Sequence, residues 1–360
     1  MTGVRSIETL SLFFTAGVVA GSVLSGGSLW AVCILVLPFS TLAYFFGAKL
    51  LKAGQAVLNA VFPLTFLLLG LFCAANAALI PGTFGSGLSE MASGGASALR
   101  SLIGEVPFRG HDTAPLLSAL LTGDRSGLSH ELTGVFRRSG ASHLLALSGL
   151  HIGIIYLILT KLTSVLGRSP ASRHIRFWLI TAAAGYFTFM TGASPSIVRA
   201  FLFILINEIL RLTGRPRKAS RVLCLALLVQ LVLEPEVISS LGFQLSYLAM
   251  GGILLVYPVM EKWYPEGPKS IMRGIWKSAA LTISCQVFTA PLVWFRFHVF
   301  PKYFLLTNLL ALPLTTVLMT SSVLTLALSA AGMCPDILVR GTDYVCGLLI
   351  RVLETVSSLP

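Results

Sequence analysis

Residues 142–165 read SHLLALSGLHIGIIYLILTKLTSV, a run of 24 residues whose only charged side chain at neutral pH is that of Lys161. An α-helix needs about 20 mostly apolar residues to cross a bilayer, so this run is long enough to span a membrane. It also contains His143, Ser148 and His151. Polar side chains are costly in hydrocarbon, and within a membrane they usually mark a pathway or a site. The run therefore predicts a spanning helix with a functional face.

The whole chain shares this apolar character. Of its 360 residues, 55% are hydrophobic and 11% are charged, whereas a soluble domain carries about 25% charged residues. Lipid is therefore the expected solvent for most of the chain, which excludes a soluble enzyme, a disordered scaffold and a secreted disulfide domain. The net charge of +12 is typical of membrane proteins, whose cytoplasmic loops are rich in Lys and Arg.

Comparable apolar runs recur along the sequence. They predict an all-α polytopic membrane protein, a helix bundle of about ten to eleven spans. The expected spans are roughly residues 9–26, 28–47, 56–79, 142–165, 176–193, 196–213, 221–234, 239–260, 276–297, 303–332 and 336–357. The run 303–332 is either one long helix or a pair broken at Pro313. The run 336–357 carries several charged residues, and it either crosses the membrane or lies in its interface.

The short loops predict the orientation of these spans. If the N-terminus is cytoplasmic, the loops 25–28, 192–196 and 234–236 are outside, and none of them contains Lys or Arg. Basic residues concentrate in cytoplasmic loops, so this distribution predicts a multi-pass protein of the cell membrane with a cytoplasmic N-terminus.

Three segments follow from this topology. Residues 1–80 hold the N-terminal transmembrane helices. Residues 81–113 are rich in Gly and Ser and are expected to form an extracytoplasmic linker with at most one short helix. Residues 114–360 form the main transmembrane domain, which is expected to open with two short amphipathic helices at the outer surface, within residues 114–139.

The richest polar segment lies in the fourth span. Ser148 and His151 are three residues apart and share a helix face, and His143 lies about 80° round from His151. All three are therefore expected to border one cavity. Gly149 and Gly153 form a small-xxx-small pattern that lets a neighbouring helix approach closely. The alternative is that His143 sits at the interface and His151 bonds a backbone carbonyl, with no functional role.

Other spans carry isolated polar residues. Arg199 either snorkels to the outer surface or faces a wet cavity. In a wet cavity its guanidinium would suit phosphate, because its charge is permanent and it can bind phosphate through two N–H groups. Gln244, Gln286 and Asn308 are amides in apolar runs, and such groups need a partner helix or water. One such amide commonly joins two helices, but polar residues in five spans favour a lined passage.

Several catalytic and cofactor motifs are absent from the sequence. It has no GxxxxGK[ST], no HExxH and no histidine-rich cluster, so we expect no cofactor and no metal. The six cysteines contain no CxxC pair and are expected to be small buried hydrophobes. We also expect no catalytic residue and no enzyme. Ser148 and His151 would lie on one helix at i and i+3, where a nucleophile and its base rarely reach a productive geometry.

Four blocks of the sequence resemble, in order, the signatures of the ComEC-type competence family. They are LLTGDRSGLSHELTGVFRRSGASHLLALSGLHIGIIY (120–156), TGASPSIVRAFLF (191–203), LEPEVISSLGFQLSYLAMGGI (233–253) and TAPLVWFRFHVFPKYFLLTNLLALPL (289–314). The resemblance covers residues 114–360. It implies an inner-membrane channel that passes single-stranded DNA inward during natural transformation, and it identifies 114–360 as a competence-type channel domain.

The resemblance gives the polar residues of the spans a role. The residues expected to line the DNA path are His143, Ser148, His151, Arg199, Gln244, Gln286 and Asn308. Arg137 and Arg138 are expected to contact phosphates at the outer mouth.

Family members commonly carry further parts that this chain is expected to lack. We expect no C-terminal metallo-β-lactamase-like domain after Pro360, so the chain resembles a short form of the family. The implied partners, besides single-stranded DNA and membrane lipid, are an extracytoplasmic DNA receptor, a separate nuclease, and a cytoplasmic helicase or single-strand-binding protein.

Two other functions stay open. A secondary transporter of a small anionic solute would explain Arg199 and the broken helices, although the sequence has no inverted repeat. An intramembrane hydrolase would use Ser148 as the nucleophile, but no oxyanion donor is evident.

Overall fold

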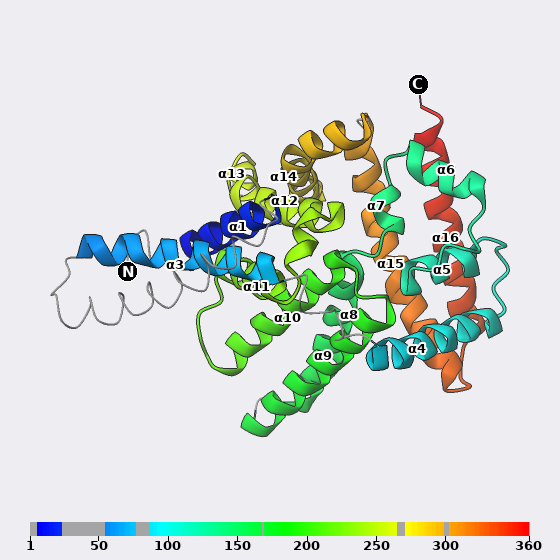
Figure 1. Cartoon of the computed structure of the whole chain (residues 1–360). Helices are drawn as coiled ribbons and strands as arrows, with labels where there is room; N and C mark the ends of the chain where they lie inside the picture. The colour runs from blue at the N-terminus through cyan, green and yellow to red at the C-terminus, as the bar shows by residue number, and fades with distance from the viewer. Residues whose placement is uncertain are drawn as a thin grey trace. The chain divides into compact units, whose positions relative to one another are not determined.

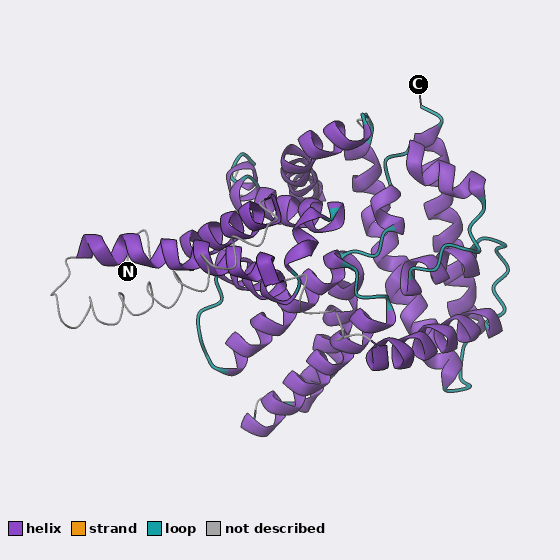
Figure 2. Cartoon of the chain, in the orientation of Figure 1, coloured by secondary structure: helices purple, strands orange, loops and turns teal. Residues whose placement is uncertain are grey.

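The computed structural model describes residues 6–23, 55–76, 86–167, 169–264, 271–298 and 302–359 of the chain. These residues form helices joined by turns and loops, and no strand occurs among them (Figure 2). The all-α fold class predicted from the sequence is therefore confirmed. The expected span 28–47 lies outside the described residues.

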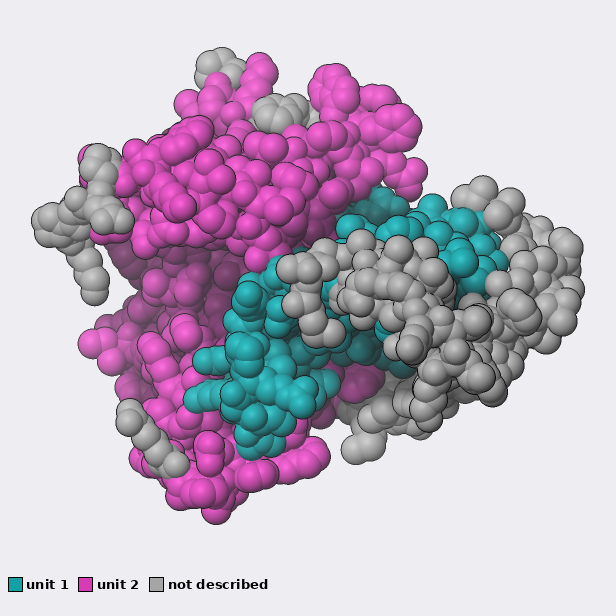
Figure 3. Space-filling view, turned by 90° about the vertical axis from the view of Figure 1, so that its left-hand side faces the viewer, with its two compact units in different colours: residues 1–85, 202–244 teal, residues 86–201, 245–360 magenta. Residues whose placement is uncertain are grey.

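The chain divides into two compact units, which Figure 3 distinguishes by colour. Unit 1 comprises residues 1–85 and 202–244, and unit 2 comprises residues 86–201 and 245–360. Two of the three unit boundaries fall inside helices, α10 and α12. The division into residues 1–80, 81–113 and 114–360 stays a prediction.

The helices follow one another along the chain as Figure 1 labels them. In unit 1 they are α1 (Ile7–Val23), α3 (Gln55–Asn76), α11 (Ala219–Leu233) and the 3₁₀ helix η2 (Pro235–Ser239). In unit 2 they are α4 (Ser86–Glu105), α5 (Thr113–Thr122), α6 (His130–Arg138), α7 (Ser142–Leu145), α8 (Gly149–Leu162), η1 (Thr163–Leu166), α9 (Pro170–Met190), α13 (Tyr257–Glu261), α14 (Ile271–Phe297), α15 (Phe304–Ala330) and α16 (Asp336–Ser357). The two divided helices are α10 (Pro195–Leu212) and α12 (Leu241–Leu255).

Four helical segments of the described residues are long and apolar enough to cross a membrane. They are Gly149–Leu166, Leu241–Glu261, Ile271–Phe297 and Phe304–Ala330. Shorter apolar helices lie at Ile7–Ser22, Phe62–Ala75, Thr113–Thr122 and Ala219–Leu233. The larger number of spans stays a prediction, although a helix occupies most of each expected span within the described residues.

In unit 1, α1 and α3 cross closely because glycines line their contact. A Cβ atom on Gly17 would overlap the carbonyl group of Leu67, and one on Gly70 would overlap the carbonyl group of Phe14. Small residues let two helix backbones approach in a membrane protein, where van der Waals packing is a main source of helix association.

In unit 2, α15 and α16 pack along each other and share an apolar core with α4 to α8. The core-facing residues of α16 are Val339, Thr342, Cys346, Leu349, Leu353 and Val356. They follow one another at steps of three and four, so they form one stripe along the helix. α16 is therefore amphipathic, and it is not among the four segments that meet the length and composition of a span.

Two expected spans are interrupted. The run 142–165 is divided into α7 and α8, and the run 239–260 is divided into α12 and α13. Pro258 lies in the first turn of α13, where its missing N–H has no cost, whereas continuing α12 through it would lose a backbone hydrogen bond. The run 303–332 is one helix, α15, although it contains Pro313.

The residues before α7 also differ from expectation. The segment 81–113 contains α4, a helix of 20 residues. The first helix after it, α5, does not lie at a surface, because Leu116, Leu117 and Leu120 are all at most 1% exposed. Its sequence, TAPLLSALLT, is too apolar to offer a polar face. The next helix, α6, is amphipathic as predicted, with Leu132, Val135 and Phe136 buried.

The α1–α3 crossing predicts the effect of one methyl group. The substitution Gly17→Ala should lower the free energy of unfolding by about 1–3 kcal/mol, because the added Cβ must push α1 and α3 apart. Thermal unfolding of the detergent-solubilised protein measures this. Gly94→Ala is the matched control, since a Cβ there has no neighbour within 4 Å. An unfolding midpoint as high in Gly17→Ala as in the control would contradict the close crossing.

Candidate functional site

An interruption between α7 and α8 creates the candidate site. α7 ends at Leu145, and Ala146 is already extended, with φ −77° and ψ 124°. Ser148 is extended too, with φ −134° and ψ 172°, and it is the N-cap of α8. The first residue of α8 is therefore Gly149, in the middle of a run that the sequence suggested would be one continuous helix. A new helix N-terminus, with its unpaired N–H groups and positive dipole end, opens inside the bundle.

Ser148 and His151 meet at this terminus as a capping box. The Ser148 N–H donates to His151 Nδ1 at 3.1 Å, and the Ser148 hydroxyl lies 3.1 Å from the same nitrogen. Because a backbone N–H can only donate, Nδ1 is the unprotonated nitrogen and a neutral ring carries its proton on Nε2. The two side chains are closer than we expected for positions i and i+3, since Ser148 lies outside the helix.

The turn between α5 and α6 holds the interruption in place. Gly123 has φ +82° and ends α5, and a Cβ there would overlap the side chain of Leu147. Arg125 Nε donates to the Leu145 carbonyl at 3.1 Å. This carbonyl belongs to the last residue of α7, where helix carbonyls lose their intrahelical partners. The turn therefore contacts both the end of α7 and the extended segment that follows it.

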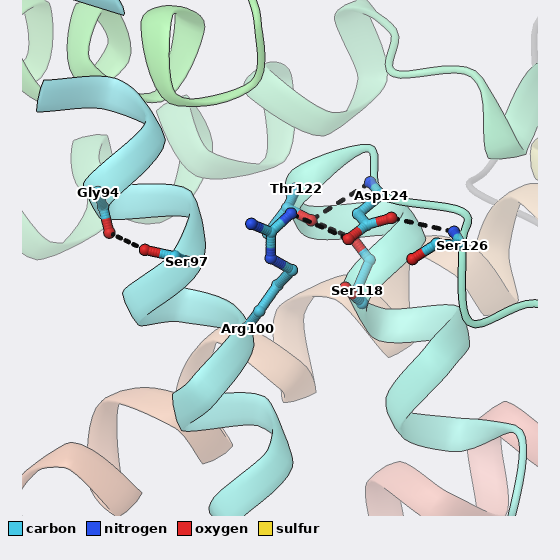
Figure 4. Close-up of polar contacts among 7 residues, drawn as sticks. All are labelled: Gly94, Ser97, Arg100, Ser118, Thr122, Asp124 and Ser126. Carbon is cyan, nitrogen blue, oxygen red and sulfur yellow. Dashed lines mark hydrogen bonds and ion pairs between the residues drawn. The ribbon is translucent and has the colours of Figure 1, made fainter. Parts of the chain in front are cut away.

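Asp124 ties the same turn to α4 (Figure 4). Its carboxylate accepts from the Ser126 N–H at 3.0 Å and from Arg100 Nη1 at 2.9 Å. The Ser126 N–H, followed by the charge of Arg100, lowers the pKa of Asp124 below its ordinary value. The ionised form of Asp124 is therefore the one that orders the turn.

Arg199 lies against the exposed terminus of α8. It is 8% exposed, and its Nη2 is 3.0 Å from where a Cβ on Gly149 would lie. A side chain at position 149 would require the guanidinium to shift by a few tenths of an ångström. Arg199 Nε donates to the hydroxyl of Ser246, which is 3.1 Å from the hydroxyl of Ser196. Two hydroxyls, one guanidinium and a helix N-terminus therefore gather at one place in unit 2.

The charge of Arg199 has no acidic partner at this place. None of the ion pairs within the described residues includes Arg199; its hydrogen-bond partner there is a neutral hydroxyl. A buried charge is strongly unfavourable unless it is paired. The arrangement is therefore suited to an anion, since both the guanidinium and the helix dipole favour negative charge.

Further polar atoms of unit 2 are buried without a partner among the described residues. They include His151 Nε2, Asn308 Oδ1 and Thr315 Oγ1. His151 belongs to α8 and the other two to α15, which packs against α8. Buried polar groups need hydrogen-bond partners, so these atoms are suited to water or to a polar ligand.

The remaining predicted residues are placed differently. His143 is exposed on α7, and its ring contacts the Gly140 carbonyl at 3.2 Å. Gln244 belongs to unit 1, where its amide donates to the Ile238 carbonyl at 2.9 Å and so has a local structural partner. Gln286 is half-buried on α14. Arg137 and Arg138 are exposed at the end of α6.

Three residues of the site were missed by sequence reasoning: Ser196, Ser246 and Arg125. Ser196 precedes Arg199 by three residues, so the two share a helix face. That spacing was a signal in the sequence for a hydroxyl beside the guanidinium. The partners Ser246 and Leu145 lie far along the chain from Arg199 and Arg125, and no local pattern identifies them.

Comparisons with known proteins match this region. The sequence model of a family described as Competence protein matches residues 120–360. "ComE operon protein 3" of Bacillus subtilis (strain 168) is 26% identical over 224 residues, which are 61% of this chain and 27% of that protein. "Recombination protein 2" of Haemophilus influenzae is 29% identical over 224 residues, 58% of this chain and 28% of that protein.

A third relative, "Competence protein ComA" of Neisseria gonorrhoeae, is 25% identical over 179 residues, 48% of this chain and 25% of that protein. The matched segments thus span little more than a quarter of these relatives' length. No solved structure is significantly similar to this fold.

The hydrogen bond from Arg125 predicts a local effect at the interruption. Arg125→Ala leaves the Leu145 carbonyl without its donor, which should lower local stability by about 1 kcal/mol. Amide hydrogen exchange at residues 146–150 should then be faster by about fivefold. Arg173→Ala, at an exposed position on α9, should leave this exchange unchanged. Equal exchange in the two variants would show that Arg125 does not stabilise the break.

Asp124 predicts an acid dependence of the turn. Because its pKa is lowered in the folded protein, its stabilisation is complete above the ordinary aspartate pKa and is lost as the pH falls through the lowered value. Protection of the Ser126 amide from hydrogen exchange should decline over that range. Asp124→Ala, which removes the acceptor, should show low protection at every pH. Full protection of Ser126 in Asp124→Ala would refute this role.

Proposed function

Because the chain belongs to the competence protein family, we propose that it forms a channel for the inward passage of single-stranded DNA during natural transformation. The chain has helices long and apolar enough to cross a membrane, which suits a path through a bilayer. We place it in the inner membrane with its N-terminus in the cytoplasm, because the short loops without Lys and Arg favour this orientation.

The observation that carries the proposal is the buried guanidinium of Arg199 beside the N-terminus of α8. A passing strand presents one phosphate after another, and each phosphate supplies the negative charge that this position lacks. The site's neutral partners, Ser196 and Ser246, leave that charge available. A single basic contact also fits transport, since a strand must leave each position as readily as it enters.

The buried polar atoms support a wet path next to this contact. His151 Nε2, Asn308 Oδ1 and Thr315 Oγ1 offer a donor and acceptors without a net charge. Proteins that accept any single-stranded sequence combine basic groups for the backbone with contacts that tolerate every base. We propose Ser148, His151, Arg199 and Asn308 as the lining of the path, with Gln286 further along it. Arg137 and Arg138 would meet phosphates at its mouth.

The energy for movement would come from other proteins. The sequence has no nucleotide-binding P-loop motif, so we propose a cytoplasmic helicase or single-strand-binding protein as the motor. A DNA receptor outside and a nuclease for the second strand would complete the machinery.

Two alternatives use the same site. A transporter for a small anion would also place a helix N-terminus and an arginine in mid-membrane. A hydrolase would use Ser148, but His151 is fully buried and its Nδ1 lone pair already accepts the Ser148 N–H. We therefore interpret the Ser148–His151 contact as a helix cap and propose no catalytic role.

The proposal predicts that Arg199 governs DNA uptake. Arg199→Ala removes a charge-assisted contact of about 1.5–3 kcal/mol, so uptake should fall by about 10- to 100-fold. Arg199→Lys should restore part of it, because lysine keeps the charge but loses the bidentate fork. Uptake is measured as labelled DNA that enters a nuclease-protected pool in a deletion strain complemented with each variant.

Two controls separate this role from a structural one. Each variant must reach the membrane at the level of the unaltered chain, and Arg173→Ala, which removes an exposed charge on α9, should transform normally. Normal uptake in Arg199→Ala would overturn the proposal. A normal DNA phenotype combined with loss of solute uptake in liposomes would favour the transporter instead.

A further inference from the structure

Three arginines that the proposed path does not use converge elsewhere in unit 2. Arg109, in the loop between α4 and α5, and Arg340 and Arg351, on α16, line one cleft of about 390 Å³. Tyr344 lines it as well and is 70% exposed. We name this feature the α16 cleft. All three arginines are exposed.

The geometry of α16 puts these groups on one face. Arg340, Tyr344 and Arg351 fall within about 40° of one another around the helix axis. The stripe that packs into the core lies on the opposite side, since its residues, such as Cys346 and Leu349, are buried. Arg340 and Arg351 are 11 residues apart, which is about 16 Å along the helix. The face is therefore an extended basic strip with an aromatic ring between two guanidiniums.

The lining of the cleft is basic, with three arginines against one carboxylate. Its one lining carboxylate, that of Asp343, accepts the Arg109 N–H at 2.7 Å and the Gly110 N–H at 3.4 Å. Those two bonds attach the loop to α16 and occupy the carboxylate. Asp336 makes a long, exposed ion pair of 3.4 Å with Arg340, and exposed pairs of this kind are weak. Glu354 and Asp112 do not line the cleft but line an adjoining pocket, which shares Asp343, Gly347 and Arg351 with it.

The floor of the cleft is open. Gly347 lies on α16 between Tyr344 and Arg351, and a Cβ there would meet no atom within 4 Å. A flat ligand can therefore lie along the helix beside the tyrosine ring. Arginines suit phosphate because they bind it bidentately, and an exposed aromatic ring suits a stacked base whatever its identity.

We propose that the α16 cleft is a second binding site for single-stranded DNA, which binds the phosphodiester backbone at Arg109, Arg340 and Arg351 and stacks a base on Tyr344. The inference rests on the proposed function, because it gives the channel a place to hold the strand apart from the path at Arg199. Phospholipid headgroups offer the same phosphodiester chemistry, so the test must separate the two sources.

The test measures binding of a fluorescent oligothymidylate to the full chain in nanodiscs of zwitterionic lipid. Combining Arg109→Ala, Arg340→Ala and Arg351→Ala should weaken binding and reduce the slope of log affinity against log salt by roughly 2, since each lost phosphate contact contributes about 0.7 for a single strand. Tyr344→Leu should weaken binding without changing this slope. Tyr344→Phe keeps an aromatic ring and should bind the oligonucleotide as tightly as the unaltered chain.

Two controls accompany this test: a triple variant that removes the same charge elsewhere, and a variant that should tighten binding. Combining Arg173→Ala, Arg215→Ala and Arg217→Ala removes the same charge at exposed positions elsewhere and should leave the slope unchanged. Asp336→Asn frees Arg340 from its carboxylate and should tighten binding, a gain that a folding defect cannot produce. Equal slopes in the two triple variants would overturn the proposal.

Further outcomes distinguish DNA from lipid as the ligand of the cleft, and the cleft proposal from the proposed function. If the cleft variant loses binding to phosphatidylglycerol vesicles but keeps its oligonucleotide affinity, the cleft binds lipid and the proposal fails. If Arg199→Ala abolishes DNA uptake while the cleft variant binds oligonucleotide and takes up DNA normally, only this inference fails. If neither variant alters uptake, the proposed function fails as well.

Discussion

A guanidinium buried in an apolar bundle needs a negative partner, and much of the candidate site can be understood from this one constraint. Arg199 is held by the Ser246 hydroxyl and by the approach of Gly149, and neither neutralises its charge. The interruption before α8 adds the positive end of a helix dipole to the same place. Both features favour an anion at this place. A structure that retains them is therefore suited to bind a negative ligand in passing, and DNA presents such a ligand at every nucleotide.

The interruption itself depends on contacts from distant parts of the sequence. Ser148 and His151 cap α8 from within, and Arg125 bonds the carbonyl at the end of α7 from the turn after α5. Asp124 then connects that turn to α4. The segment before α7 is thus not only a linker but a support for the candidate site. A change in α4 or in the turn can therefore reach the break through two hydrogen bonds.

Particular residues show what the sequence could and could not predict. Long apolar runs mark the helices, because membrane thickness sets their length, and α15 and α16 lie where these runs predicted them. Ser148 and Gly149 were identified as polar and small positions, but their run looked continuous, since part of what holds the interruption comes from the turn at Gly123 and Arg125. Gly149 and Gly153 looked equivalent in the sequence; only Gly149 has a close neighbour, Arg199. α5 was expected at a surface and is buried, because the elements that cover it, α15 and α16, follow about 200 residues later.

The central claim is that a DNA strand passes the interruption between α7 and α8. The most direct measurement places the photo-crosslinking residue benzoylphenylalanine at position 146, which is exposed within the interruption, and traps labelled DNA during uptake. Position 178 is the control, because Trp178 is 68% exposed on α9 and makes no part of the site. The account predicts a covalent DNA adduct at 146 and none at 178. Uptake that continues without any adduct at 146, or with equal adducts at both positions, would contradict it.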